Sequence, residues 1–239
     1  MTWLWGIFFS AALVAQAYAA TVGGAVRLVD SRDPNVRRKS DYSGVVLWLE
    51  RSGGAPPALQ PRTATIVQKQ KRFSPHVIAV PAGTTVEFPN LDPIFHNAFS
   101  NFAGQPFDVG LYPPGTSQKI RFQRPGVVRV FCNIHPTMSA VIVVTPTPYN
   151  AISNKAGDFT IAGVQPGSYR LRVFHERASE QTLRALERTV TVDQHDVQLA
   201  TLSISESGFI ETPHKNKYGR DYPPVIEDNS IYSAAGSTP

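Results

Sequence analysis

The chain has 239 residues, of which 42% are hydrophobic and 17% are charged, and its formal net charge is +5. This length and composition exclude a predominantly disordered chain and suffice for one or two hydrophobic cores. The single cysteine excludes an intramolecular disulfide framework. The positive charge is spread out, with short clusters only at residues 37–39 and 69–72. It indicates a solvated surface, with steering toward an acidic partner as the alternative.

The N-terminus predicts an export signal. An apolar stretch from Trp3 to Val14 precedes Ala17-Tyr18-Ala19, which fits the small-x-small pattern before a cleavage site, so we expect residues 1–19 to be removed. The alternative is a retained anchor, because the n-region lacks Lys and Arg and the stretch from Trp3 to Ala20 approaches a short membrane span. We expect a periplasmic or secreted protein, no membrane span after cleavage, and no nucleic acid partner.

Most of the remaining sequence predicts short strands bounded by Gly, Pro, Asn and Asp. The first two strands are expected at residues 24–29 and 44–50, on either side of a polar, charged loop. Residues 52–62 contain three prolines and two glycines, which is typical of a connector.

Residues 132–138 form the most informative segment, because they place a cysteine, a histidine and a methionine at positions i, i+3 and i+6. A tight loop between two strands can direct all three side chains at one point, and Pro136 would stiffen that loop. A fourth ligand must come from elsewhere, and His96 is placed to supply it. A thiolate, two imidazoles and a weak thioether form a ligand field that favours copper cycling between oxidation states. The candidate ligands are therefore His96, Cys132, His135 and Met138.

Residues 72–144 resemble the cupredoxins, or blue copper proteins. The Cys132-x-x-His135-x-x-Met138 spacing, with a proline after the histidine, is similar to that of the amicyanin type, and Phe88-Pro89-Asn90 also matches. The resemblance implies one type 1 copper, with Met138 as a weak axial ligand.

The resemblance also implies roles for residues around the metal. Asn97 would tie the two ligand loops together and donate its backbone amide to the sulfur, and Asn90 and Pro136 would support the ligands. A surface patch for a transient redox partner would include Phe95, Pro114 and Pro136.

The chain is further similar to exported bacterial proteins described as methylamine utilisation proteins. Many of those have Asp-Trp where this chain has Pro136-Thr137. This difference leaves the ligands intact and alters the surface that a partner would meet.

We predict an all-β chain in which a cupredoxin Greek-key β-sandwich, residues 61–147, is inserted into a second, smaller sandwich. Residues 148–206 resemble the transthyretin-like carboxypeptidase regulatory-like domain through Pro166-Gly167-Ser168-Tyr169, and residues 20–52 resemble its opening strands. The alternative is two domains in tandem, and the strand pairing of residues 45–49 distinguishes the two arrangements. A short helical turn is expected at residues 178–184, and a flexible or surface-draped tail at 207–239.

The leading functional hypothesis is an exported one-electron carrier. No nucleophile, base or open coordination position is evident, so an enzyme is not predicted. One alternative is copper storage, delivery or sensing without electron shuttling. Another is an adhesion or scaffold protein whose second sandwich contacts a protein or glycan. Zinc or a vestigial site remains open for the ligands, and ordinary structural roles are expected for His76, His175, His195 and His214.

Overall fold

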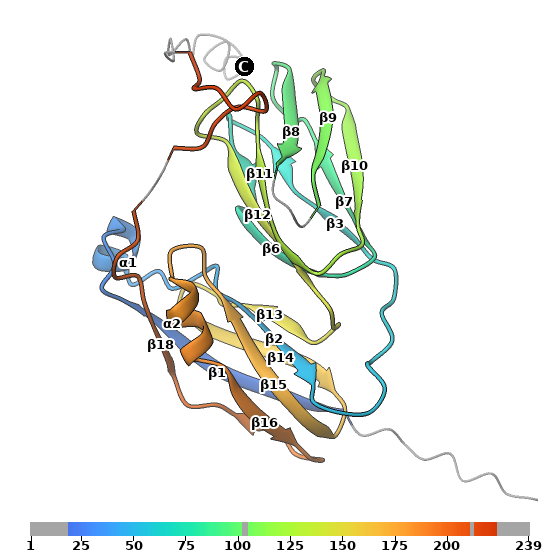
Figure 1. Ribbon diagram of the computed structural model, residues 1–239, viewed down its shortest axis with the longest axis vertical. Coiled ribbons are helices and arrows are strands. Elements are labelled where there is room, and N and C mark those ends of the chain that lie inside the picture. The colour runs from blue at the N-terminus through green and yellow to red at the C-terminus, as the bar shows by residue number, and fades with distance from the viewer. Residues whose placement is uncertain (1–18, 102–104, 211–212, 224–239) are drawn as a thin grey trace, which may run out of the picture.

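The structure is a computed structural model that describes residues 19–101, 105–210 and 213–223, so the predicted export signal lies outside it apart from Ala19. The prediction of an all-β chain is confirmed, because these residues form strands in several sheets and only two short helices. Neither of those helices is long and apolar enough to cross a membrane. The strands gather into an upper and a lower β-sandwich (Figure 1).

The upper sandwich contains the ligand candidates and consists of two sheets and a hairpin. One sheet has the order β10-β7-β3, formed by Ser117–Phe122, Thr84–Pro89 and Thr63–Thr65. The other has the order β6-β12-β11-β8-β9, formed by Val77–Pro81, Ser139–Thr145, Gly126–Phe131, His96–Ser100 and Phe107–Tyr112. The hairpin pairs β4 (Val67–Gln68) with β5 (Phe73–Ser74).

The lower sandwich combines strands from before and after the upper one. One sheet has the order β13-β2-β15-β16, formed by Asn150–Ile152, Val46–Arg51, Gly167–Phe174 and Arg188–Val192. The other joins β14 (Asp158–Val164), β1 (Ala20–Val29) and β17 (Val197–Gln198), with β18 (Leu202–Ser205) also paired to β1. The strand that the sequence singled out, β2, pairs with β15, from Val46 opposite Phe174 to Arg51 opposite Tyr169.

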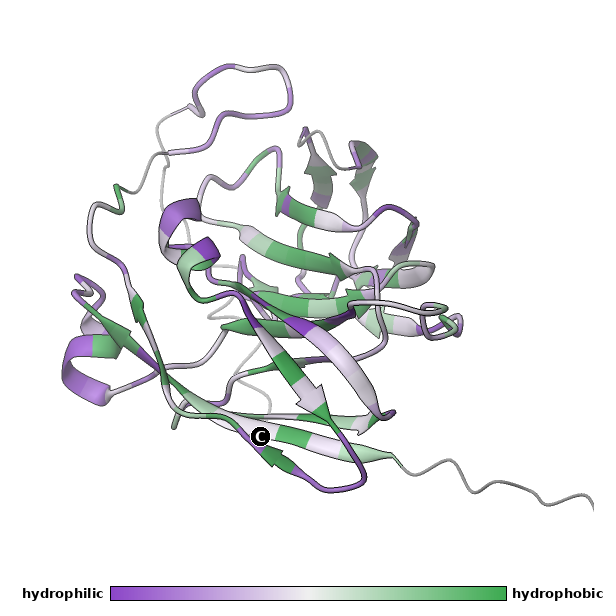
Figure 2. Ribbon diagram, turned by 60° about the horizontal axis from the view of Figure 1, so that its bottom comes forward, coloured by the Kyte–Doolittle hydropathy of each residue, from purple (hydrophilic) through white to green (hydrophobic). Residues whose placement is uncertain are grey.

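Strands between the sandwiches bury both of their faces, which explains their uninterrupted apolar runs. On β2, Leu47 and Leu49 enter the lower core, whereas Val46 faces the upper sandwich. There Val46 meets Val141 and Val143 of β12, whose alternate residues line the upper core. Figure 2 shows the corresponding concentration of hydrophobic residues on strands and of hydrophilic residues in the helices and loops.

The helices depart in part from the sequence expectations. The loop predicted between the first two strands contains a helix, α1 (Pro34–Lys39), which begins where the Asp33 side chain accepts a hydrogen bond from the Asn35 amide. Pro34 fits the first turn because a proline there loses no helical hydrogen bond. Helix α2 (Glu180–Ala185) lies near the expected helical turn and is capped by Ser179.

The described part of the predicted tail lies on the protein surface. After β18, residues 213–223 return to the upper sandwich and contact the loop between β11 and β12 (Figure 1). Two of these contacts are hydrogen bonds to backbone carbonyls of that loop.

Truncating a buried side chain in the lower core should destabilise the protein. Leu47→Ala removes a fully buried side chain and should lower the free energy of unfolding by about 2–5 kcal/mol. Val29→Ala, at a position that is 37% exposed, is the control and should change it by less than about 0.5 kcal/mol. Denaturant titration followed by tryptophan fluorescence measures both, and equal effects would contradict this account of the core.

Candidate metal centre

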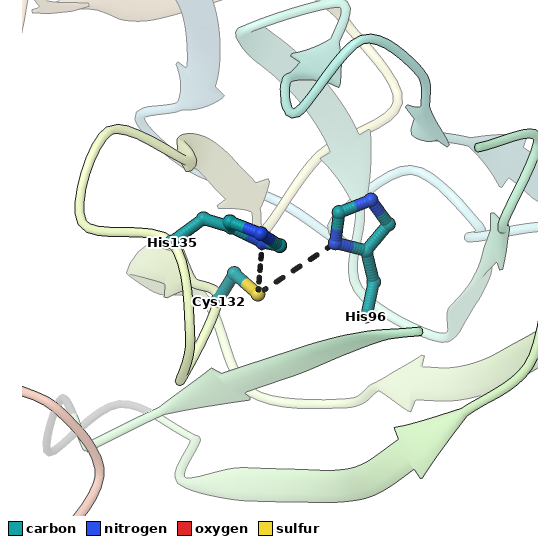
Figure 3. Close-up of side chains that lie close together, drawn as sticks. All are labelled: His96, Cys132 and His135. Atoms are coloured by element: carbon teal, nitrogen blue, oxygen red, sulfur yellow. Dashed lines mark hydrogen bonds between the residues drawn. The ribbon is translucent and has the colours of Figure 1, made fainter. Parts of the chain in front are cut away.

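Three of the four predicted ligands converge at one end of the upper sandwich. His96 is the first residue of β8, Cys132 follows the end of β11, and His135 lies in the loop that leads to β12. The Sγ of Cys132 is 3.9 Å from Nδ1 of His96 and 3.7 Å from Nδ1 of His135. All three donor atoms lie within 4.8 Å of one another (Figure 3).

These distances suit a shared metal ion. A metal about 2.0–2.1 Å from each nitrogen and about 2.3 Å from the sulfur, with angles between tetrahedral and trigonal, would put nitrogen and sulfur roughly 3.5–3.8 Å apart. The separation from His135 lies within this range, and the separation from His96 exceeds it only slightly, so a metal could bind with small side-chain movements. The two separations fit copper and zinc equally well, so the donor chemistry and not the spacing favours copper.

Both imidazoles have the protonation state that a metal ligand needs. Burial lowers the pKa of His96, and burial together with the neighbouring His96 lowers the pKa of His135 to about 4. Both rings are therefore neutral at pH 7. The Nε2 of His96 lies 2.6 Å from a carboxylate oxygen of Asp92, which can only accept, so Nε2 carries the hydrogen and Nδ1 presents its lone pair to the site.

Asp92 belongs to the segment that resembles the cupredoxins, but the sequence alone predicted no role for it. It is buried, and its carboxylate accepts hydrogen bonds from the backbone amides of Gln70 and Lys71 as well as from His96. Burial alone would raise its pKa, but the hydrogen bonds from Lys71, His96 and Gln70 outweigh burial and lower it. The spacing Asp92-x-x-x-His96 is a weak signal, because only the fold brings the β4–β5 turn to this carboxylate.

Cys132 is fully buried, and burial raises the pKa of its thiol. Backbone amides of Ile134, Asn97 and His135 donate to the sulfur and oppose that shift, but burial outweighs them. A bound cation would favour the thiolate. Met138 is also fully buried and packs in the same core as Cys132. Its amide donates to the carbonyl of His135, which closes the loop, and its axial role stays a prediction.

The predicted supporting residues divide into separate roles. The Asn97 amide reaches the sulfur as the resemblance implies, but its side chain donates to Asp108 and to the Gly110 carbonyl of β9 and does not tie the two ligand loops directly. Asn90 shapes the loop before His96 by donating to the Ile94 carbonyl and accepting from the Asp92 amide.

His135 is half-buried, and the residues of the predicted surface patch differ in their exposure. Phe95 and Pro114 are exposed, and Pro136 is half-buried. Three further exposed apolar residues lie in the loop before β8, in the loop after β11 and on β9, and the sequence did not predict them. These are Leu91, Leu111 and Ile134, which are 57%, 59% and 44% exposed.

The remaining histidines lie outside the centre. His175 is buried against Glu206, His76 pairs with Glu176, and His195 is exposed beside Asp193. The His214 ring contacts the backbone carbonyl of Pro136, in the loop that carries Cys132 and His135. None of the four belongs to the ligand cluster found among the described residues.

Comparison with known proteins finds partial likenesses only. No protein-family model matches the chain, and no curated protein matches it. Among solved structures, it is 31% identical to a Cu-containing nitrite reductase from Thermus scotoductus over 40% of this chain and 25% of the other, with a TM-score of 0.34. The present chain thus spans only about a quarter of the reductase.

Two smaller proteins are similar over most of their own length. A purple cupredoxin from Nitrosopumilus maritimus is 26% identical over 34% of this chain and 99% of that one, with a TM-score of 0.31. A mutant of amicyanin in the reduced state is 17% identical over 35% of this chain and 82% of that one, with a TM-score of 0.33. Likenesses with TM-scores this low do not establish a function for the chain.

The Asp92 contact predicts a loss of metal affinity on substitution. In Asp92→Asn, the NH2 group faces either the Gln70 amide, or both the Lys71 amide and Nε2 of His96. In either orientation a donor meets a donor and the negative charge is lost, so the support of His96 is weakened. Copper affinity should fall about 10- to 100-fold in a chelator competition titration. Asp193→Asn, with a 71% exposed side chain, is the matched control, and equal affinities in the two variants would refute the assignment.

Proposed function

We propose that the protein is an exported type 1 copper protein that carries one electron at a time between redox partners. The observation that carries the proposal is the convergence of two neutral imidazole nitrogens on a buried cysteine sulfur. His96, Cys132 and His135 would hold the ion, with Met138 as the weak fourth ligand.

Copper bound by this donor set would supply a one-electron couple. The chain supplies restraint: Asp92 fixes the orientation of His96, and three backbone amides fix the sulfur. A site that moves little when the charge of the ion changes has a low reorganisation barrier. Burial of His96, Cys132 and Met138 excludes water from the ligand side chains.

A redox partner would dock on the apolar surface around His135. Among the described residues, four of the exposed large hydrophobic side chains lie on the loops and strand next to the ligands: Leu91, Phe95, Leu111 and Ile134. His135 is the least buried of the three converging ligands, which favours it as the point of electron exit. Such a contact would be small and transient.

The hairpin next to this surface favours an acidic partner. Its turn, residues 69–72, contains Lys69, Lys71 and Arg72, and the Asp92 carboxylate anchors it beside His96. Lys69 and Arg72 are exposed, and no ion pair involving them occurs within the described residues. Their charge is therefore available to steer an anionic surface toward the site.

Other parts of the proposal rest on the sequence alone. Export to the periplasm or outside the cell rests on residues 1–19. The carboxypeptidase regulatory-like identity of the lower sandwich, a contact of that sandwich with protein or glycan, and a link to methylamine utilisation rest on resemblance.

Copper loading tests the proposed function. The wild-type protein should bind one copper per chain, show an intense visible thiolate-to-copper absorption, and be reduced and reoxidised reversibly. Cys132→Ser should abolish the absorption, whereas His195→Ala, at an exposed histidine, should retain it. Copper binding without that absorption would overturn the type 1 assignment. Absorption without reversible reduction would favour storage or delivery.

Small redox probes of opposite charge test the role of the hairpin. At low ionic strength, Lys69→Glu combined with Arg72→Glu should slow reduction by anionic hexacyanoferrate(II) about tenfold and speed reduction by cationic hexaammineruthenium(II). The difference should shrink at high salt. Lys155→Glu combined with Arg188→Glu makes the same charge change on the lower sandwich and serves as the control. Equal rates in the two double variants would contradict local steering.

A further inference from the structure

Residues 213–223 lie against the loop of residues 132–138 and are called the strap below. In Figure 1 the strap is the red segment that crosses the loop after β11. The loop carries Cys132, His135 and Met138, so the strap contacts the segment that holds three of the four proposed ligands.

Two strap side chains bind backbone carbonyls of the loop. The Tyr222 hydroxyl donates to the carbonyl of Cys132 at 2.7 Å, and Nε2 of His214 lies 2.7 Å from the carbonyl of Pro136. The His214 ring stacks on Phe131, with centroids 4.0 Å apart, and meets the edge of the Tyr222 ring. Burial raises the pKa of Tyr222, so its hydroxyl keeps the proton that it donates.

A third strap residue links the two parts of the chain that carry ligands. The Lys217 amide donates to the side-chain oxygen of Asn133 in the loop at 3.0 Å, and Lys217 Nζ lies 2.7 Å from a carboxylate oxygen of Asp108. The other carboxylate oxygen of Asp108 accepts from the Asn97 side chain at 2.7 Å. Asn97 is the residue after His96. The side-chain connection between the two ligand segments, which the resemblance assigned to Asn97 alone, is therefore made here by Asn97, Asp108 and Lys217 together.

The loop has limited support of its own. Its internal backbone hydrogen bonds join the Cys132 amide to the Met138 carbonyl and the Met138 amide to the His135 carbonyl. The carbonyls of Cys132 and Pro136 are instead satisfied by the strap. A partly buried carbonyl that loses its donor favours a loop conformation in which it reaches water.

We propose that the strap positions the metal-ligand loop, with Tyr222 and His214 as the positioning residues. The role of the strap in copper geometry rests on the proposed function, whereas its hold on Cys132 applies equally to the metal-free protein. Without the strap contacts, the loop opens more often, the buried thiol becomes accessible to reagents, and the sulfur is held less firmly against a bound metal.

Thiol labelling of the metal-free protein tests the hold on Cys132. Tyr222→Phe keeps the ring and removes the hydroxyl, so labelling of Cys132 by iodoacetamide under native conditions should become about two- to tenfold faster. Adding His214→Ala should increase the rate further. Tyr218→Phe is the matched control, because Tyr218 lies in the same strap and is 70% exposed, and its rate should equal the wild-type rate.

Copper-loaded variants provide the second measurement. Tyr222→Phe should shift the visible thiolate-to-copper absorption and the reduction potential, which a general loss of stability would leave unchanged. Unaltered labelling in the Tyr222→Phe, His214→Ala double variant, or equal acceleration in Tyr218→Phe, would overturn the strap proposal. If labelling accelerates but wild-type protein gives no visible copper absorption, the strap stands and the proposed function fails.

Discussion

The hydrogen bond between Asp92 and His96 is the interaction on which the rest of the site depends. A buried carboxylate is stable only when its oxygens are well supplied with donors, and here the donors are one imidazole and two amides of the β4–β5 turn. The contact with His96 therefore fixes its tautomer and directs its free nitrogen at Cys132. The two amide contacts hold the turn that carries Lys69, Lys71 and Arg72 beside the proposed docking surface.

The remainder of the upper sandwich holds the loop of residues 132–138 against this fixed point. Residues of β11 and β12 enter the upper core on one face, and Val141 and Val143 of β12 pack on the lower sandwich on the other. The strands that flank the ligand loop are thereby held on both sides. The loop itself is held by the strap, so restraint of the sulfur comes from residues before, within and far beyond residues 132–138.

The sequence predicted the features that depend on local pattern. Short runs bounded by Gly, Pro, Asn and Asp predicted a chain made of strands, and the spacing of Cys132, His135 and Met138 predicted the loop on which they lie. The sequence predicted no role for Asp92, because a carboxylate four residues before a histidine acquires meaning only when a distant turn packs on it. It treated residues 33–40 as a loop although Asp33-Pro34 is a helix-start signal. The strap residues Tyr222 and His214 show no periodicity, and their roles depend on contacts with residues 78 to 90 positions away.

The route of the chain between the sandwiches has a consequence for modular construction. Trp48 of β2 lies opposite Asn150 of β13, so the points at which the polypeptide leaves and re-enters the lower sheet are neighbours in an antiparallel ladder. Topologically, the whole upper sandwich occupies the place of a hairpin turn. The upper sandwich could therefore be inserted or removed without changing the strand order of the lower one, because closing the gap requires only a few residues.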